Sequence, residues 1–247
     1  MIPADAQQAW CELRSDAGRH VALGGFGLLL ITEGLAALDI ANRNILWPSL
    51  LTYALISCAL IRWLPLHHPH RRFGWGNRIT LLRVILLCLL TSLSYTDSGD
   101  GLVMVLAGGF LLLDGVDGYA ARRGGTASPF GARFDLEIDA LFVLFAALLI
   151  WNQGKAGVWI LGSGVLRYGF LAASWRWPAL AAPLPPNRRR AAIGITNTCF
   201  LMLGLGPWGD HPAVTLLLAA GLSAIAGSFA IDAAAQFAQP TNKPQPS

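Results

Sequence analysis

The chain has 247 residues, of which 54% are hydrophobic and only 13% are charged, and its formal net charge at neutral pH is +4. Soluble domains usually carry about 25% charged residues, so this composition argues against an ordinary soluble enzyme or binding module. The basic balance does not indicate a nucleic-acid partner either, because the basic residues lie in short loops between long apolar runs.

Eight apolar runs follow one another along the chain, and each is close to the length that crosses a bilayer as a helix. Such a span needs about 18 or more predominantly apolar residues. The predicted spans are residues 20–38, 45–65, 79–96, 101–121, 136–152, 156–175, 191–207 and 212–236. We therefore predict an all-α integral membrane protein, built as a helical bundle of about eight transmembrane helices.

The basic residues indicate the orientation of these spans. When the N-terminus is placed inside, the inner segments hold most of the 18 Lys and Arg residues, and the outer loops hold only Arg43 and Lys155. Basic residues accumulate on the cytoplasmic side of membrane proteins. The sequence thus predicts a multi-pass protein of the cell (inner) membrane with both termini in the cytoplasm and residues 111–140 at the cytoplasmic face.

Residues 111–140, "LLLDGVDGYAARRGGTASPFGARFDLEIDA", concentrate four aspartates in an otherwise apolar chain. Asp114 and Asp117 are three residues apart at the end of the fourth span, and Asp135 and Asp139 are four apart at the start of the fifth, so each pair shares a helix face. A short loop between antiparallel helices brings the two faces together. Four converging carboxylates repel one another unless cations neutralise them, and hard divalent ions such as Mg²⁺ or Mn²⁺ prefer oxygen ligands. We therefore predict a site for two divalent cations.

The glycines and arginines between the aspartates favour a ligand site over isolated ion pairs. The glycines leave room for a ligand to approach the backbone, and Arg122 lies one turn beyond Gly118, where it can meet an anionic group such as a diphosphate. Any single aspartate could instead cap a helix or pair with Arg122, Arg123 or Arg133. The spacing of all four together favours a binding site.

Two stretches of the sequence resemble the CDP-alcohol phosphotransferase family. The family signature D-x2-D-G-x2-A-R-x8-G-x3-D-x3-D is matched by Asp114, Asp117, Gly118, Ala121, Arg122, Gly131, Asp135 and Asp139. "GNRITLLR" is similar to an Asn-x-x-Thr-x-x-Arg element of the first conserved helix, through Asn77, Thr80 and Arg83. The resemblance implies that residues 71–238 form a six-helix core, that residues 1–70 are an N-terminal extension with two added transmembrane helices, and that residues 239–247 are a flexible cytoplasmic tail.

The resemblance also implies a reaction in which a substituted phosphate passes from a CDP-linked donor to an alcohol hydroxyl, with release of CMP. Carried over by position, Asp114, Asp117 and Asp135 bind the metal ions, while Asp139 contributes to the metal site and acts as the general base. The residues that the resemblance assigns to the cytidine and diphosphate are Gly118, Ala121, Arg122, Gly131, Asn77 and Thr80.

The donor and acceptor are predicted from the membrane setting and from basic residues near the site. CDP-diacylglycerol is the commonest donor of the family and suits a membrane enzyme that makes a phospholipid. In family members with phosphorylated acceptors, basic residues within the sixth span and at the start of the seventh hold the acceptor phosphate. Basic residues at the same places here favour glycerol 3-phosphate or an inositol phosphate over serine or choline. The candidate acceptor residues are Arg83, Arg167, Arg189 and Arg190. The arginines of "NRRR" could instead mark topology alone, and a homodimer is implied by the resemblance only.

Three alternatives remain open at the level of sequence. A member of the same class could transfer a phospho-alcohol from CDP-choline or CDP-ethanolamine to diacylglycerol. A cation transporter would also carry acids within its spans, although it would distribute them along several helices instead of at one interface. A structural member without activity would not need four intact aspartates.

Overall fold

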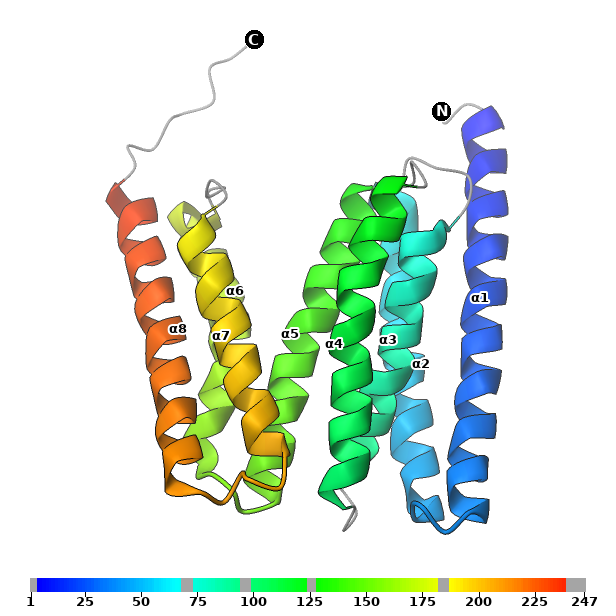
Figure 1. Cartoon of the computed structure of the whole chain (residues 1–247). Helices are drawn as coiled ribbons and strands as arrows, with labels where there is room; N and C mark the ends of the chain where they lie inside the picture. Colours follow the sequence, from blue (N-terminus) through cyan, green and yellow to red (C-terminus); the bar gives the residue numbers. More distant parts are fainter. Residues whose placement is uncertain (1–3, 68–72, 94–98, 124–127, 182–186, 239–247) are drawn as a thin grey trace. The chain divides into compact units, whose positions relative to one another are not determined.

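The computed structural model describes residues 4–67, 73–93, 99–123, 128–181 and 187–238, and within these ranges all regular secondary structure is helical (Figure 1). The α-helices are α1 (Ala4–Ala37), α2 (Leu46–His67), α3 (Trp75–Leu93), α4 (Asp100–Arg123), α5 (Pro129–Asn152), α6 (Gly162–Arg176), α7 (Arg188–Leu205) and α8 (Pro212–Ala238). Three 3₁₀ turns, η1 (Arg43–Ile45), η2 (Val158–Leu161) and η3 (Pro178–Ala181), join some of them. The predicted all-α class is confirmed.

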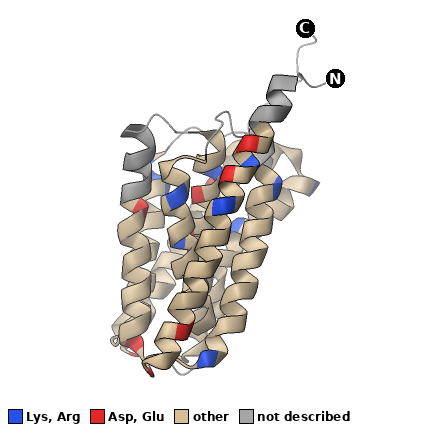
Figure 2. Ribbon diagram, turned by 90° about the vertical axis from the view of Figure 1, so that its right-hand side faces the viewer, with Lys and Arg blue, Asp and Glu red and all other residues tan. Residues whose placement is uncertain are grey.

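Several of these helices have the length and the apolar composition of membrane spans. Among the described residues, four segments are long and apolar enough to cross a bilayer: Trp10–Ala37, Arg43–Leu64, Trp75–Leu93 and Pro212–Ala238. The other predicted spans also form helices, but α6 has only 15 residues, α7 begins with three arginines, and α5 carries four charged residues in its first half. Figure 2 shows that charged positions lie mostly toward the helix ends.

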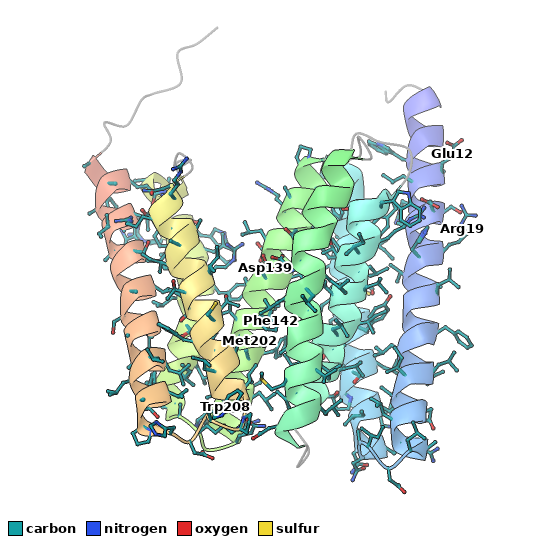
Figure 3. The ribbon with its side chains drawn as sticks, viewed as in Figure 1. Glu12, Arg19, Asp139, Phe142, Met202 and Trp208 are labelled. Carbon is teal, nitrogen blue, oxygen red and sulfur yellow. The ribbon has the colours of Figure 1, made fainter. Side chains whose placement is uncertain are left out.

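The first helix begins earlier than its apolar run predicts. It starts at Ala4, well before residue 20, and includes a charged segment in which Glu12 and Arg19 lie near one end of α1 (Figure 3). Local pairs support this extension, because Arg19 lies 3.5 Å from Asp16 and the Nδ1 of His20 lies 2.7 Å from the Asp16 carbonyl oxygen. Such i, i+3 and i, i+4 contacts stabilise a helix beyond its buried part.

The structure divides into two compact units, residues 1–145 and residues 146–247. In the first unit α1 to α4 run side by side (Figure 1), and α3 packs against α1, α2 and most extensively α4. Polar contacts join these helices: the Tyr53 hydroxyl donates to the Val21 carbonyl at 2.7 Å, and the Ser49 hydroxyl donates to that of Ser92 at 2.8 Å. The central position of α3 buries most of its residues.

The second unit is built on the pair α7 and α8, with α6 packed on α8 and on η3. Asn187 caps α7, because its side-chain oxygen accepts from the Arg189 backbone N–H at 2.9 Å. At the other end of α7, the ammonium group of Lys155 donates to the Gly206 carbonyl at 3.0 Å. A cation at the C-terminal end of a helix is favoured by the helix dipole.

Candidate metal and nucleotide site

The candidate site begins on α3, where Asn77, Thr80 and Arg83 follow one another at intervals of three residues. This spacing places them along one helix face, and all three side chains are buried. A buried polar face inside a membrane-spanning helix is costly unless its groups find partners. The partners of Arg83 come from α4 and α5.

Arg83 is completely buried, and its guanidinium group contacts three carboxylates. One nitrogen lies 2.8 Å from an Asp114 oxygen, and the group also pairs with Asp135 and Asp139. The planar fork of an arginine can hold several carboxylate oxygens in a fixed arrangement. Helices α3, α4 and α5 are thereby joined at one point.

Two aromatic rings lie beside this cluster. The guanidinium carbon of Arg83 is 4.4 Å from the centroid of the Phe110 ring, a distance typical of a cation–π contact. Phe110 in turn stacks on Phe142 with centroids 4.3 Å apart, and Phe142 follows Asp139 by about one turn on α5 (Figure 3). The Phe110 ring thus covers one face of the guanidinium group, which is fully buried, and Phe142 supports that ring.

The three carboxylates also form a group that can hold a cation. One oxygen from each of Asp114, Asp135 and Asp139 lies within 4.8 Å of the others, and their side chains are 37–44% exposed although Arg83 is fully buried. A carboxylate has two oxygens and about four lone-pair positions, so it can accept from an arginine and still ligate an ion. The donor set therefore fits Mg²⁺ or Mn²⁺.

The start of α5 approaches α3 at Gly131. A Cβ atom on Gly131 would lie 2.8 Å from the side-chain oxygen of Asn77 and 3.3 Å from the hydroxyl of Ser128, which itself accepts from the Gly131 N–H at 3.0 Å. Only glycine leaves that space to Asn77, whose amide donates to the Phe73 carbonyl. Two of the residues predicted to bind the nucleotide are thus direct neighbours, and Thr80 lies one turn further along α3, bonded to the Gly76 carbonyl at 3.1 Å.

Four of the predicted site residues cannot be placed in this geometry. Asp117, Gly118, Ala121 and Arg122 belong to the last two turns of α4, but their side chains lie outside the described residues. Their predicted roles at the metal ions and the nucleotide stay predictions.

The predicted acceptor residues of the second unit gather around one acid. Arg189 and Arg190, at the start of α7, lie 3.1 and 3.3 Å from the same oxygen of Asp232 on α8. Asp232 is 8% exposed and Arg190 is half-buried. Arg167 lies on α6 and is also partly buried.

Phe110, Asp232 and Asp16 contribute to these clusters although they were not predicted as site residues. The sequence does not indicate that Phe110 belongs to the site, because a phenylalanine in an apolar helix normally belongs to the core. The sequence does give an indication for Asp232, since an acid within an apolar span is a candidate functional residue. Asp16 contributes from a distance: its carboxylate accepts from the Phe73 N–H at 3.0 Å and so fixes the chain just before α3.

Comparison with known proteins supplies one match. The family model described as CDP-alcohol phosphatidyltransferase matches residues 74–230, more than half of the chain. No curated protein and no solved structure matches the sequence. The matched range begins just before α3 and ends within α8. It contains every residue of the clusters described above except Asp16, Phe73 and Asp232, and it leaves α1 and α2 outside.

Proposed function

The chain belongs to the CDP-alcohol phosphatidyltransferase family, and on that premise we propose that it transfers a phosphatidyl group from CDP-diacylglycerol to an alcohol hydroxyl with release of CMP. The family transfers substituted phosphate groups from CDP-alcohols, so the proposal adds the donor and the direction of transfer. The observation that carries it is the convergence of Asp114, Asp135 and Asp139 from two helices at one point. A donor with acyl chains suits a protein whose helices include several membrane spans.

Members of the family generally depend on divalent metal ions, and the carboxylate group described above fits them. We propose that Asp114, Asp117, Asp135 and Asp139 hold two such ions, Mg²⁺ or Mn²⁺. When bound, the ions supply Lewis-acid stabilisation of the charge that develops on the diphosphate as CMP departs.

The chain's own residues position the reacting groups. We propose that Asp139 accepts the proton of the entering alcohol as the general base, which is consistent with its partly exposed carboxylate. Arg83, predicted among the acceptor residues, is engaged with three carboxylates. Its contacts therefore favour a positioning role, in which Arg83 keeps Asp135 and Asp139 close enough together to share an ion.

The nucleotide is proposed to bind beside this group, along α3, α4 and the start of α5. Its pocket would be formed by Asn77, Thr80, Gly118, Ala121, Arg122 and Gly131. Support comes from the close approach of Gly131 to Asn77, which places the start of α5 against α3. Arg122 would meet the diphosphate, since a guanidinium group forms paired hydrogen bonds with phosphate oxygens.

The acceptor is proposed to carry a phosphate, as glycerol 3-phosphate or an inositol phosphate does. Arg189 and Arg190 share a single carboxylate, that of Asp232. Two guanidinium groups lie side by side here, and guanidinium groups form paired hydrogen bonds with phosphate oxygens, which supports an anionic ligand. Arg167 is proposed to join them at the acceptor phosphate.

The setting of the enzyme follows from the same premises. We propose that it is a homodimer in the cell (inner) membrane, with its active site and both termini on the cytoplasmic side. The bias of basic residues toward the predicted inner loops supports this orientation.

A reconstituted assay tests the proposal. Purified protein is incubated with Mg²⁺ or Mn²⁺, CDP-diacylglycerol and, in separate reactions, glycerol 3-phosphate, an inositol phosphate or serine, and CMP and lipid products are measured. We expect CMP release and a phosphorylated lipid product with a phosphorylated alcohol, and loss of both with EDTA. CMP release from CDP-choline or CDP-ethanolamine with diacylglycerol would support the alternative direction instead. Cation uptake into liposomes without CMP release from any donor would indicate a transporter.

A further inference from the structure

A cavity separate from the carboxylate group lies in the first unit, between α2 and α5. Its volume is about 350 Å³ and its walls are mostly apolar, with Ile56, Leu60 and Trp63 on α2 and Phe134, Ile138 and Leu141 on α5. This volume is within the range of sites that bind small molecules, which are typically apolar with a few polar groups. The polar groups here are Arg133 and Glu137.

This cavity is distinct from the carboxylate site because most of its lining on α5 faces a different side of that helix. Successive residues of an α-helix are rotated by about 100°. Asp135 and Asp139 therefore share one face, and the charged lining residues Arg133 and Glu137 lie about 120–160° around the helix from them. The apolar residues Phe134, Ile138 and Leu141 lie about 60–160° away, with Ile138 the nearest to the aspartate face. A lipid in the cavity would not be the molecule whose diphosphate reaches the aspartates.

One wall of the cavity comes from a helix that precedes the family match. The match begins at residue 74, whereas α2 ends at His67. The cavity thus exists only because the chain adds α2 to its core. Segment Arg43–Leu64, which contains the lining residues of α2, is apolar and long enough to cross a membrane, so the cavity lies within reach of bilayer lipid.

The charged and aromatic residues of the cavity indicate which part of a lipid lies where. Trp63 is near the end of α2 and Arg133 is near the start of α5, so both belong to the same end of the cavity. Tryptophan is enriched at the membrane–water interface, and basic pockets between transmembrane helices bind phosphate-containing lipid head groups. From Arg133 the apolar lining continues along α5 to Leu141, a rise of about 12 Å.

We propose that this cavity binds one phospholipid with an anionic head group, its phosphate at Arg133 and one acyl chain along the apolar lining between α2 and α5. Arg133 is exposed and stands at the mouth, while Glu137 is one turn deeper and partly covered. The guanidinium group attracts the head group, and the deeper carboxylate keeps the phosphate from moving further in. The bound lipid would fill the space between the added helix α2 and the helix that carries Asp135 and Asp139.

Photo-cross-linking tests this site without any nucleotide, so its outcome is independent of the proposed reaction. The full-length protein is reconstituted in phosphatidylcholine vesicles containing a small fraction of phosphatidylglycerol with a photoactivatable acyl chain. We expect mass spectrometry to find the lipid attached to residues 56–63 of α2 and to residues 134–141 of α5. Labels spread evenly over the outer faces of all helices, with no enrichment at the cavity lining, would overturn the proposal.

Two pairs of variants sharpen the test. Ala59→Trp fills the cavity, whereas Ala54→Trp places the same side chain on an exposed position of α2 outside the lining. We expect the first to lower the cross-linking yield about tenfold and the second to leave it unchanged. Equal yields in the two variants would contradict an acyl chain in the cavity.

The second pair tests the head group. Arg133→Gln and Glu137→Gln each remove one charge from the same helix face, and native mass spectrometry after partial delipidation measures the retained lipid. We expect only Arg133→Gln to lower the preference for phosphatidylglycerol over phosphatidylcholine, by about fivefold. An equal loss of this preference in both variants would mean that Arg133 and Glu137 only pair with each other. The assignment of the lipid phosphate to Arg133 would then be wrong. Thermal unfolding of every variant confirms that it is folded.

Discussion

Arg83 is completely buried in a membrane-spanning helix, where an isolated guanidinium group would be strongly disfavoured. The structure resolves this cost by surrounding it with Asp114, Asp135 and Asp139, and with the face of the Phe110 ring. The dependence is mutual, because three carboxylates at this separation repel one another without a cation. Removing one member of a buried charged cluster leaves the others uncompensated.

Replacing Arg83 by Gln should therefore lower the free energy of unfolding by about 3–5 kcal/mol. We further expect added Mg²⁺ to raise the melting temperature of this variant more than that of the unmodified protein, because the ions replace the lost positive charge. Thermal unfolding with and without Mg²⁺ measures both effects. The matched change Arg43→Gln removes an exposed partner of Glu33 and should cost no more than about 1 kcal/mol. A Mg²⁺ response of Arg83→Gln equal to that of the unmodified protein would speak against the positioning role.

Asp139 is the residue whose chemistry can be tested most directly. Asp139→Asn keeps the shape of the side chain but removes the group that would take the proton, so we expect kcat for CMP release to fall about 100-fold or more. The control Glu33→Gln neutralises a carboxylate on α1 that pairs with Arg43 away from the site, and it should retain normal rates. Full activity of Asp139→Asn would remove the general-base assignment.

At the scale of elements, the contact between the start of α5 and α3 depends on Gly131. A glycine-to-alanine change inside a helix normally stabilises it by about 0.5–1 kcal/mol, because alanine loses less conformational freedom on folding. At Gly131 the added methyl group would lie 2.8 Å from the Asn77 oxygen, so a side chain or a helix must move. Overpacking of this kind typically costs about 1–3 kcal/mol.

Gly131→Ala should consequently lower the melting temperature and raise the KM for the CDP-linked donor, since Asn77 is displaced with α5. Gly108→Ala on α4 is the matched control, because nothing lies within 4 Å of its added carbon. That variant should be as stable as the unmodified protein or slightly more so. The comparison is made by thermal unfolding and by initial rates of CMP release at varied donor concentration. If Gly131→Ala and Gly108→Ala show the same melting temperature and the same KM, the close approach of Gly131 to Asn77 does not contribute to donor binding.

At the scale of the whole molecule, the distribution of charge predicts which end of each helix faces the cytoplasm. Most basic residues fall in segments that the alternating spans place on one side, and only Arg43 and Lys155 fall on the other. The structure adds that Lys155 is buried against the Gly206 carbonyl at the end of α7, so this cation has a local structural use. The position of Lys155 in a predicted outer loop is thus explained by this local contact.

Reporter fusions check this orientation. We expect green fluorescent protein to fluoresce when fused at either terminus, because it matures in the cytoplasm, and alkaline phosphatase at the same positions to be inactive. The phosphatase inserted at Gly154, in the turn after α5, should be active, since the spans place that turn outside. Active phosphatase at a terminus would reverse the predicted orientation and move the aspartates to the other face.

The sequence by itself determined those properties that depend on neighbours along the chain. Composition and apolar run length were enough for an all-helical membrane protein, and intervals of three and four residues were enough to pair Asp114 with Asp117 and Asp135 with Asp139 on shared helix faces. The helix ends were less well determined, as at α1, because charged residues joined by local ion pairs extend a helix beyond its apolar part.

Only the tertiary structure decided which faces meet. It brought Arg83 between three carboxylates, Asp232 between Arg189 and Arg190, and Gly131 against Asn77. These contacts join residues that are tens of positions apart, and they depend on how each helix is rotated about its axis and how closely it packs. Residue spacing fixes the geometry within one helix but carries no information on the rotation of its neighbour.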